Sequence, residues 1–331
     1  MQVLLTGGTG FVGINIAEVL AGDGHQVVVY SKRPMIPQAA QMLSEKPGRV
    51  VWEEGDVLSE ERIAEVMEKY GIDFVVHAAA ITPNRDREKE QMRTVLQVNC
   101  LGTLNVLNAA AKHKVNRFVY ISSVAVYGDS AQQYDPVFED VVKNPRSTYE
   151  TSKFAAERLV RRYAELHGTD AVSLRLGDVF GAWEYRTGVR DTMSAPCQAV
   201  YRALRHEKAV LSKPGATGWI YGLDTALAVK AVLEAKELRH FAYNCGGVSR
   251  WPVSDFCELL RTYIPDFTYE IDPEKEPNVS FFSVPDNGMF DMSRLEEDAG
   301  FRPVYDFERA TAHYMEWALR YPELTLTEPK R

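Results

Sequence analysis

The stretch that decides the fold opens the chain: Gln2-Val3-Leu4-Leu5-Thr6-Gly7-Gly8-Thr9-Gly10-Phe11-Val12-Gly13. Its first residues predict a strand, and residues 11 to about 21 repeat apolar side chains at helical spacing. The glycine pattern G-x-x-G-x-x-G lets the chain turn tightly and lets backbone approach a pyrophosphate with no Cβ in the way. The helix N-terminus adds free N–H groups and the positive end of a dipole. An ordinary turn is the alternative, but its place between strand and helix favours a dinucleotide site, formed by Gly7, Gly10, Phe11, Val12 and Gly13.

The alternation of strand and helix continues to about residue 177. Short apolar runs predict strands at 27–30, 50–52, 74–77, 118–121 and 171–175, and amphipathic stretches predict helices at 59–70, 87–112 and 147–167. Such regular alternation is typical of βαβ units, so the predicted fold class is α/β, a Rossmann-type doubly wound parallel sheet.

After residue 178 the pattern loosens, and proline, glycine and aromatic residues become frequent. Helices are expected near 194–207, 222–236, 252–263 and 305–320, with a strand at 241–244. We therefore expect a dinucleotide-binding domain of residues 1–177 plus about 218–246. Residues 178–217 and 247–331 would form a smaller mixed α/β domain that caps the carboxyl edge of the sheet, where ligands of such folds bind.

Composition narrows the class of protein. The 331 residues are 45% hydrophobic and 25% charged, with a net charge of -8, so a nucleic acid or an anionic membrane surface is not an expected partner. The four cysteines show no CxxC or zinc-type spacing, which predicts free thiols in a reducing compartment, the cytoplasm, and no metal site. No apolar run approaches the roughly 20 residues of a membrane span. No leader peptide is expected, because Met1 runs directly into the first strand.

A second motif carries proton chemistry. Tyr149-Glu150-Thr151-Ser152-Lys153 is Y-x-x-x-K, which places Tyr149 and Lys153 on one face of a helix. A nearby ammonium and an oxidised nicotinamide would lower the pKa of the phenol, which could then exchange a proton with a carbinol. An isolated match is weak, but Ser122 and Ser123 leave a predicted strand at the same edge. We favour Ser123 as the hydroxyl that assists Tyr149, with Ser122 structural.

The residues after the other strands indicate a cofactor. Ser31, Lys32 and Arg33 stand where an NAD site usually places a carboxylate, so they predict pairing with a 2′-phosphate and NADP(H) in preference to NAD(H); a solvated basic loop is the alternative. Asp56 could accept from the adenine amino group, or could be a helix cap or turn residue. Further cofactor contacts are expected at Val57, in the small-residue run Ala78, Ala79 and Ala80, and at Tyr149 and Lys153 themselves.

These motifs together resemble the extended short-chain dehydrogenase/reductases, the group of sugar epimerases and dehydratases. The resemblance rests on TGGxGFxG at residues 6–13, HxAA at 77–80, VNxxGT at 98–103, SSxxVYG at 122–128, LRxxxVYG at 174–181, YNVGGG at 243–247 and DxSKxxxxLGFxP at 291–303. It implies Ser123 as the catalytic hydroxyl, Asn99 as a cofactor contact, and a homodimer joined by a four-helix bundle of the helices near 87–112 and 147–167.

Departures from the family pattern bear on the substrate. Dehydratases of the family carry Thr-Asp-Glu where this chain has Ser123-Val124-Ala125, so dehydration is not expected. Nucleotide-sugar members carry Arg where this chain has Thr217, and Asp178 would repel a diphosphate. A smaller sugar, polyol, lactone or other hydroxylated substrate is therefore expected, although Arg186, Arg190 and Lys213 could still hold an anion. The candidate substrate contacts are Thr82, Ser123, Asp178, Arg186 and Arg190, with a solvated loop as the alternative for the two arginines.

Three functions fit these residues. The first is a reversible NADP(H)-linked alcohol/carbonyl oxidoreductase, in which Tyr149 is the acid/base, Lys153 orients the nicotinamide ribose and Ser123 polarises the carbonyl. The second is an epimerase that uses the same atoms and keeps its cofactor bound. The third is a non-catalytic NADP(H) sensor or scaffold, which the intact Tyr149–Lys153 pair disfavours.

Overall fold

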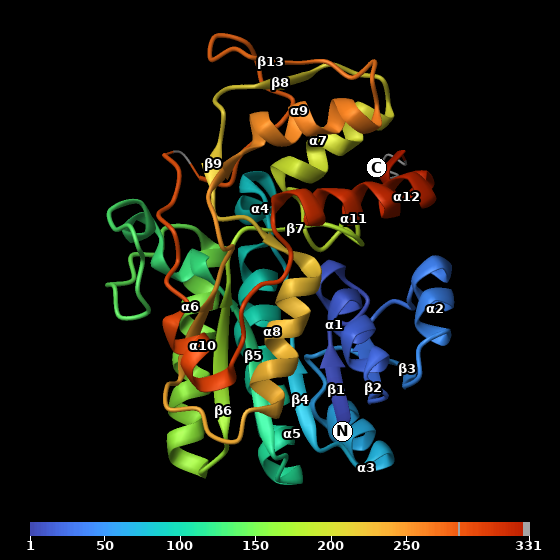
Figure 1. Cartoon of the computed structure of the whole chain (residues 1–331). Coiled ribbons are helices and arrows are strands. Elements are labelled where there is room, and N and C mark those ends of the chain that lie inside the picture. The colour runs from blue at the N-terminus through green and yellow to red at the C-terminus, as the bar shows by residue number, and fades with distance from the viewer. Residues whose placement is uncertain (284, 327–331) are drawn as a thin grey trace.

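The computed structural model describes residues 1–283 and 285–326, and its frame is a parallel sheet of seven strands (Figure 1). In the strand order β11-β6-β5-β4-β1-β2-β3 the chain starts at β1, runs outward to β3, and then returns to β4 on the other side. This reversal leaves a crevice at the carboxyl ends of β1 and β4. The predicted Rossmann-type doubly wound fold is confirmed, with strands β1 (Gln2–Thr6), β2 (Gln26–Ser31), β3 (Arg49–Glu54), β4 (Phe74–His77), β5 (Arg117–Ser123), β6 (Ala171–Leu176) and β11 (Ala242–Cys245).

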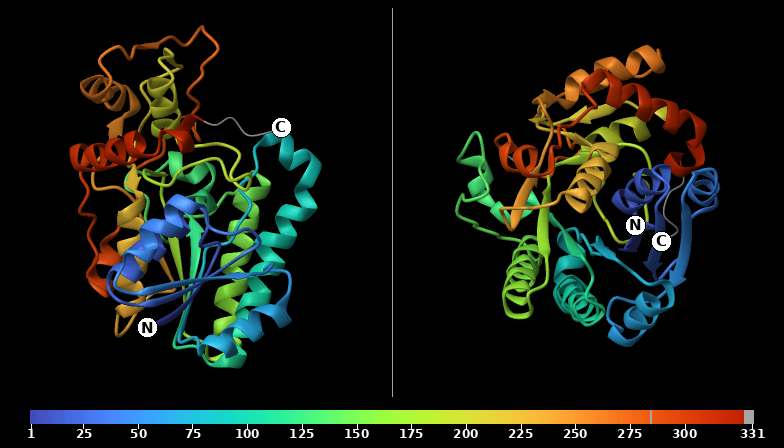
Figure 2. Two further views of the ribbon diagram at one scale, coloured as in Figure 1. Left: turned by 90° about the vertical axis from the view of Figure 1, so that its right-hand side faces the viewer. Right: turned by 60° about the horizontal axis from the view of Figure 1, so that its bottom comes forward.

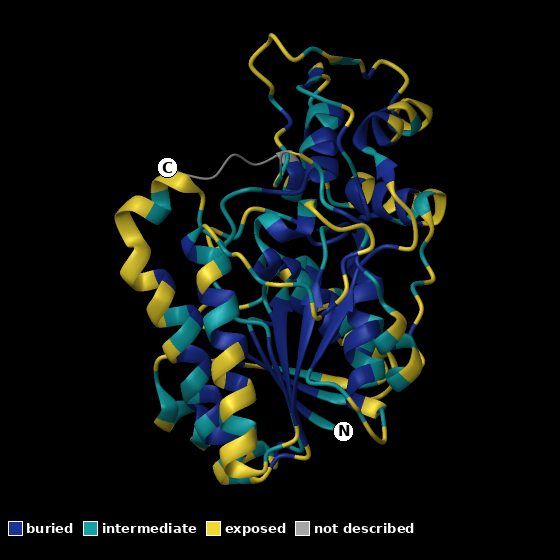
Figure 3. Cartoon of the chain, turned by 90° about the vertical axis from the view of Figure 1, so that its left-hand side faces the viewer, coloured by how far each residue is buried: buried dark blue, intermediate teal, exposed yellow. Residues whose placement is uncertain are grey.

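Helices cover both faces of the sheet (Figure 2). Leu5 and Val29 point to a core shared with one layer of helices, and their chain neighbours Leu4 and Val28 point to the core of the other. Burial on both faces explains why the strands are apolar at successive positions; Figure 3 shows the strands buried beneath partly exposed helices. The first layer contains α1 (Phe11–Gly22) and α8 (Gly222–Glu234), and the second contains α3 (Glu60–Tyr70), α5 (Gly102–His113) and α6 (Thr148–His167).

The long helix predicted at 87–112 is divided into three segments. α4 (Arg85–Leu96) has non-helical dihedrals at Gln91, a π-helical turn η1 follows at Gln97–Leu101, and α5 completes the run. Single π-helical turns are rare and occur mostly at functional sites. The sequence pattern also misses α2 (Pro37–Ser44), which is only eight residues long and has no side-chain N-cap.

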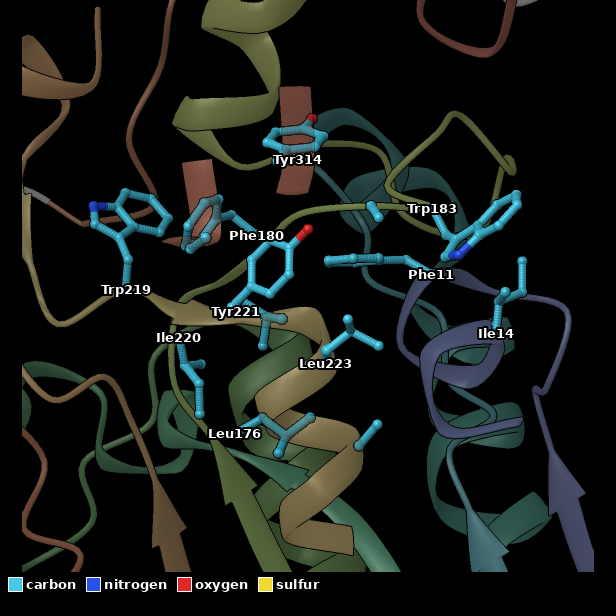
Figure 4. Close-up of a cluster of buried hydrophobic side chains, with 14 of the residues drawn as sticks. Phe11, Ile14, Leu176, Phe180, Trp183, Trp219, Ile220, Tyr221, Leu223 and Tyr314 are labelled. Carbon is cyan, nitrogen blue, oxygen red and sulfur yellow. The ribbon is translucent and has the colours of Figure 1, made fainter. Parts of the chain in front are cut away.

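Apart from α8, β11 and α10 (Ser293–Ala299), the elements after β6 lie beyond the carboxyl edge of the sheet (Figure 1). Aromatic side chains join them to the first layer of helices, and in Figure 4 the ring of Phe11 points into this cluster beside Tyr221 and Leu223. α10 differs, because it packs on β11 and α8 at the side of the sheet. The remaining elements of this part are β7 (Val179–Phe180), α7 (Ala195–Leu204), β8 (Ala209–Leu211), β9 (Ala216–Thr217), β10 (Ile220–Tyr221), β12 (Trp251–Pro252), α9 (Val253–Tyr263), β13 (Tyr269–Ile271), α11 (Phe307–Arg320) and α12 (Pro322–Leu326).

Two 3-10 helices follow β5 on the way to α6, η2 (Val124–Tyr127) and η3 (Asp129–Gln132). Among the residues that the structure describes, no helix is both long enough and apolar enough to cross a bilayer.

Candidate active site

One cleft of about 1280 Å³ runs along the carboxyl edge of the sheet, from the glycine-rich turn to the capping segments. This volume exceeds the roughly 300–1,000 Å³ of a typical small-ligand pocket, so the cleft has room for two ligands side by side. All but one of the predicted site residues line it, and the exception is Asn99.

The glycine-rich turn requires its glycines for close packing. Gly7 has φ +71°, and a Cβ there would lie 2.7 Å from the backbone nitrogen of Ala79. A Cβ on Gly13 would lie 2.3 Å from the carbonyl oxygen of Gly7. No side chain caps the N-terminus of α1, so its first amides have no acceptor within the helix. These features fit the pyrophosphate of a dinucleotide.

Phe11 contributes to this turn through its backbone. Its side chain is 7% exposed and packs in the aromatic core, where its ring points toward Tyr221 (Figure 4). The N–H groups of Phe11, Val12 and Gly13 are therefore the parts of these residues available to a phosphate.

The three polar residues that end β2 already have partners. Lys32 pairs with Asp56, with 2.9 Å between Nζ and Oδ2. Arg33 donates from Nη1 to the carbonyl of Thr187 at 2.7 Å. Ser31 donates to the carbonyl of Arg33 and accepts from the indole N–H of Trp52. Lys32 remains 73% exposed, so its ammonium keeps donors for a further anion.

Asp56 combines the two roles that its position left open. Oδ1 accepts from the backbone N–H of Leu58 at 3.0 Å, which is the turn role, while Oδ2 faces Lys32. Burial raises the pKa of this carboxyl, but the bonds from Lys32 and Leu58 outweigh burial and hold the pKa below its ordinary value. Val57 and the run 78–80 line the cleft beside it.

Tyr149, Lys153 and Ser123 meet at the end of β5. Ser147 caps α6 in a capping box with Glu150, which fixes where the helix begins and so where Tyr149 stands. Lys153 follows one turn later and donates from Nζ to the carbonyl of Ile121 at 2.6 Å. Ser123 ends β5, and its hydroxyl favours the charged form of the Tyr149 phenol.

The electrostatics of this group differ from the prediction in one respect. Burial raises the pKa of Tyr149, and the groups that oppose this are the hydroxyls of Ser123 and Thr82 and the charge of Arg190. Burial also lowers the pKa of Lys153 to about 7. The expectation that Lys153 lowers the phenol pKa is therefore wrong for the protein alone, because desolvation disfavours both charged forms.

Asn99 lies behind the cleft rather than in it. It is 2% exposed, its Oδ1 accepts from the N–H of Ile81 at 2.8 Å, and its Nδ2 donates to the carbonyl of Ile81 and to Oγ of Ser152. Ser152 in turn donates to the carbonyl of Tyr149 at 2.7 Å. Asn99 therefore joins the loop after β4 to the catalytic turn of α6, and its amide has no free donor to offer a cofactor.

A buried histidine, His77, is hydrogen-bonded to the residues that hold Asn99 in place. His77 lies 2.7 Å from Oγ1 of Thr6 and 2.9 Å from Oγ1 of Thr103, which itself donates to the carbonyl of Asn99. Since the proton of Thr103 is used there, His77 must carry its proton on Nε2 and accept from Thr6 on Nδ1. Burial lowers the pKa of His77 to about 3, so this arrangement is neutral at physiological pH.

At the substrate end, charged side chains are paired with one another. Thr217 donates to Asp178 at 3.0 Å, so the two positions that depart from the family pattern bond each other. Arg190 lies 3.3 Å from the buried carboxylate of Glu184. Lys213 pairs with Asp286 at 2.5 Å and does not line the cleft.

Two residues of the predicted substrate set are free of such pairs. Arg186 lines the cleft, is exposed, and forms no ion pair or hydrogen bond within residues 1–283 and 285–326. Thr82 pairs through its backbone with residues 189–191, while its hydroxyl contributes to lowering the pKa of Tyr149.

The sequence did not identify Tyr185, Arg87 or Glu184, although the first two line the cleft and Glu184 holds Arg190. All three act through contacts with residues more than five positions away. No local spacing therefore marks them.

A glycine turn, a doubly wound sheet and a Ser-Tyr-Lys group in one cleft define a dinucleotide-dependent enzyme. The chain belongs to the NAD dependent epimerase/dehydratase family, whose model matches residues 3–246. It is thus an enzyme of the extended short-chain dehydrogenase/reductase group, as the motifs indicated.

Curated relatives span most of the chain. A UDP-glucose 4-epimerase of Corynebacterium glutamicum is 28% identical over 79% of this chain and 80% of its own. A dTDP-glucose 4,6-dehydratase of Haemophilus influenzae is 24% identical over 96% and 98%. Among solved structures, a UDP-glucose 4-epimerase from Thermotoga maritima covers 97% of this chain and 100% of its own, with a TM-score of 0.81 and 19% identity. A UDP-glucuronic acid 4-epimerase from Bacillus cereus in complex with NAD covers 97% and 99%, with a TM-score of 0.78 and 21% identity. These structural likenesses show the fold.

Proposed function

We propose that the enzyme catalyses reversible hydride transfer at a carbinol or carbonyl of a small hydroxylated, sugar-like substrate. The observation that carries this proposal is that Ser123, Tyr149 and Lys153 all line the cleft that the glycine turn opens, with Lys153 one turn beyond Tyr149 on α6. A nicotinamide dinucleotide supplies the hydride acceptor and donor when bound.

The chain's own residues handle the proton. Tyr149 holds it on the phenol Oη at neutral pH, because burial raises its pKa. Oη gives the proton to a carbonyl oxygen in the reductive direction and takes it from the carbinol in the oxidative direction. Ser123 stabilises the charge that develops on the substrate oxygen. Lys153, neutral or charged near its pKa of about 7, lies where it can orient the cofactor ribose.

The substrate end supports a hydroxylated ligand without a diphosphate. Asp178 accepts from Thr217 with one oxygen, which leaves the other for sugar hydroxyls. Arg190 and Lys213 are already paired with carboxylates, so a diphosphate would have to displace those partners. Candidate contacts are Thr82, Ser123, Asp178, Arg186 and Arg190.

The test is a screen of sugars, sugar acids and aldehydes, each with NAD(H) and with NADP(H) in the oxidised and reduced forms. Hydride transfer is measured as the change in absorbance at the nicotinamide band during a single turnover. We expect a transient or net change with at least one hydroxylated substrate. If no such substrate changes the absorbance while the dinucleotide binds, the proposal is wrong.

A second candidate is a sugar epimerase, possibly of nucleotide sugars, that returns the hydride to the opposite face of its substrate. Arg85 and Arg186 favour it, because both line the cleft without an ion pair in the described chain and could neutralise a diphosphate. The curated relatives are nucleotide-sugar epimerases and dehydratases. Purification with bound dinucleotide and no net absorbance change on turnover would distinguish this candidate from the first.

We also propose a preference for NADP(H). Lys32 and Arg33 line the adenosine end of the cleft, and no carboxylate ends β2. Two of the solved neighbours, UDP-glucuronic acid 4-epimerase from Bacillus cereus and UDP-glucose 4-epimerase from Bifidobacterium longum, are complexes with NAD. The ratio of the two dissociation constants is therefore the test. A tenfold preference for NADH, which is about 1.4 kcal/mol, would refute this choice.

Two further proposals concern assembly and location. Leu159 and Leu166 are exposed, two turns apart on one face of α6, and Leu101 is exposed beside it, which supports a homodimer through these helices. Leu166→Glu should shift the mass measured by light scattering to that of the monomer. Cys100, Cys197, Cys245 and Cys257 are free thiols, which fits a cytoplasmic location.

A further inference from the structure

A segment between β7 and α7, residues 185–191, crosses the cleft, and residues 185–190 line it. Trp183 before it and Met193 after it are 2% and 3% exposed, so both ends of the segment are anchored in the protein. Its middle residues Arg186, Gly188 and Val189 are exposed. The middle is therefore held by hydrogen bonds rather than by burial.

Those bonds reach the three loops in which a dinucleotide would lie. Tyr185 Oη donates to the carbonyl of Thr9 in the glycine turn at 3.2 Å. Arg33 at the end of β2 donates to the carbonyl of Thr187 at 2.7 Å. Thr82 after β4 donates from its N–H to the carbonyl of Val189 at 2.8 Å. The segment thus bridges the ends of β1 and β4, the strands that flank the crevice of the sheet, and the end of β2 beside β1.

Arg87 on α4 adds the strongest tie. Its Nη1 donates to the carbonyl of Gly188 at 2.9 Å and to Asp191 Oδ1 at 3.1 Å. The N–H of Asn84 donates to the other oxygen of Asp191 at 3.0 Å. A charge-assisted bond of this kind contributes more than a neutral one.

We propose that residues 185–191 form a clasp over the bound dinucleotide, and that Tyr185 and Arg87 are positioning residues that set how fast the dinucleotide leaves. The inference rests on the proposed function only in taking a dinucleotide as the ligand. The middle of the clasp, residues 186–189, opens without unpacking the core, because hydrogen bonds of about 1 kcal/mol each hold it, whereas Tyr185 packs against the core at one end. The dinucleotide leaves only after these bonds break.

The test measures the dissociation rate of reduced dinucleotide by fluorescence after displacement with excess oxidised dinucleotide. Tyr185→Phe removes one neutral bond and should raise the rate about fivefold, and Arg87→Met should raise it about tenfold or more. Lys89→Met is the matched control, because Lys89 is an exposed cation on the same helix that pairs only with Asp86. Arg87→Met and Asp191→Asn together should raise the rate by less than the product of their separate effects, since they break one shared contact.

A second readout requires no chemistry. Trypsin should cut after the exposed Arg186, and saturating dinucleotide should slow this cut in the wild type more than in Arg87→Met. Dissociation rates of Tyr185→Phe and Arg87→Met equal to that of Lys89→Met, or cleavage unaffected by dinucleotide, would overturn the clasp. Failure of hydride transfer in the substrate screen would instead overturn the proposed function, because neither readout depends on turnover.

Discussion

The two ends of the cleft are built in different ways. At the cofactor end, backbone groups form the site. Gly7 packs against Ala79, and the N-terminus of α1 presents amides that no side chain caps. At the proposed substrate end, side chains form the site, and Asp178 and Arg190 are each bonded to another residue of the chain. A backbone site depends on steric fit and tolerates few substitutions, whereas a side-chain site changes specificity when one partner changes.

The largest expected effect lies where the two ends meet. Tyr149→Phe removes the proton donor but retains the ring, so turnover should fall about 10³-fold. Dinucleotide affinity should change far less than turnover, because the ring is retained and at most one hydrogen bond to the dinucleotide is lost. Steady-state kinetics and fluorescence titration check both, and undiminished turnover would remove Tyr149 from the mechanism.

The cofactor end should be almost as sensitive. In Gly7→Ala the new methyl group would meet the backbone of Ala79, and the dinucleotide affinity should fall roughly 100-fold, or about 2–3 kcal/mol. Gly24→Ala is the control, since Gly24 has a similar φ of +79° but no atom within 4 Å of the added Cβ. If both variants bind dinucleotide equally weakly, backbone strain rather than close packing is the cause.

The substrate end should respond in specificity. Asp178→Asn removes a charge while the bond from Thr217 can persist, so inhibition by a nucleoside diphosphate should strengthen about fivefold. The KM for a hydroxylated substrate should rise, and dinucleotide affinity should not change. Asp255→Asn, an exposed position outside the cleft, is the control. An unchanged inhibition constant would show that Asp178 does not select against diphosphates.

The smallest effect concerns the ammonium between the two ends. The folded pKa of Lys153 is about 7, whereas an unfolded lysine has a pKa of about 10.4. Below pH 7 Lys153 is charged in both the folded and the unfolded protein, and the cost of burying that charge lowers the free energy of unfolding by its full amount. As pH rises from about 7 to 10, the folded protein loses this proton while the unfolded protein keeps it, so the free energy of unfolding rises until the cost is gone. Lys153→Met should therefore raise Tm relative to the wild type by a few degrees at pH 6 and by less at pH 10. Calorimetry of the protein without cofactor measures this difference. A difference that does not vary with pH would contradict the lowered pKa.

The cofactor end could be predicted because its determinants are local. The turn from Gly7 to Gly13 and the Tyr149–Lys153 spacing depend on residues a few positions apart, and consecutive apolar residues identified most strands of the sheet. The substrate end could not be predicted from the sequence, because Glu184 meets Arg190 and Tyr185 meets Thr9 only once the chain has folded. Asn99 shows the intermediate case: the motif located it beside the site, but only the buried contacts to Ile81 and Ser152 show which way its amide points.

The π-helical turn at Gln97–Leu101 has a consequence for chain length. An α-helix advances about 100° per residue, so one extra residue in a regular helix would rotate everything that follows it. The wider π-helical turn absorbs that residue, so α5 keeps its apolar face on the core while Asn99 contacts Ser152. Deleting one residue here would restore regular winding and remove the turn that carries Asn99. The number of residues between α4 and α5 is thus tied to this buried contact, even though most of α4 lies in contact with solvent.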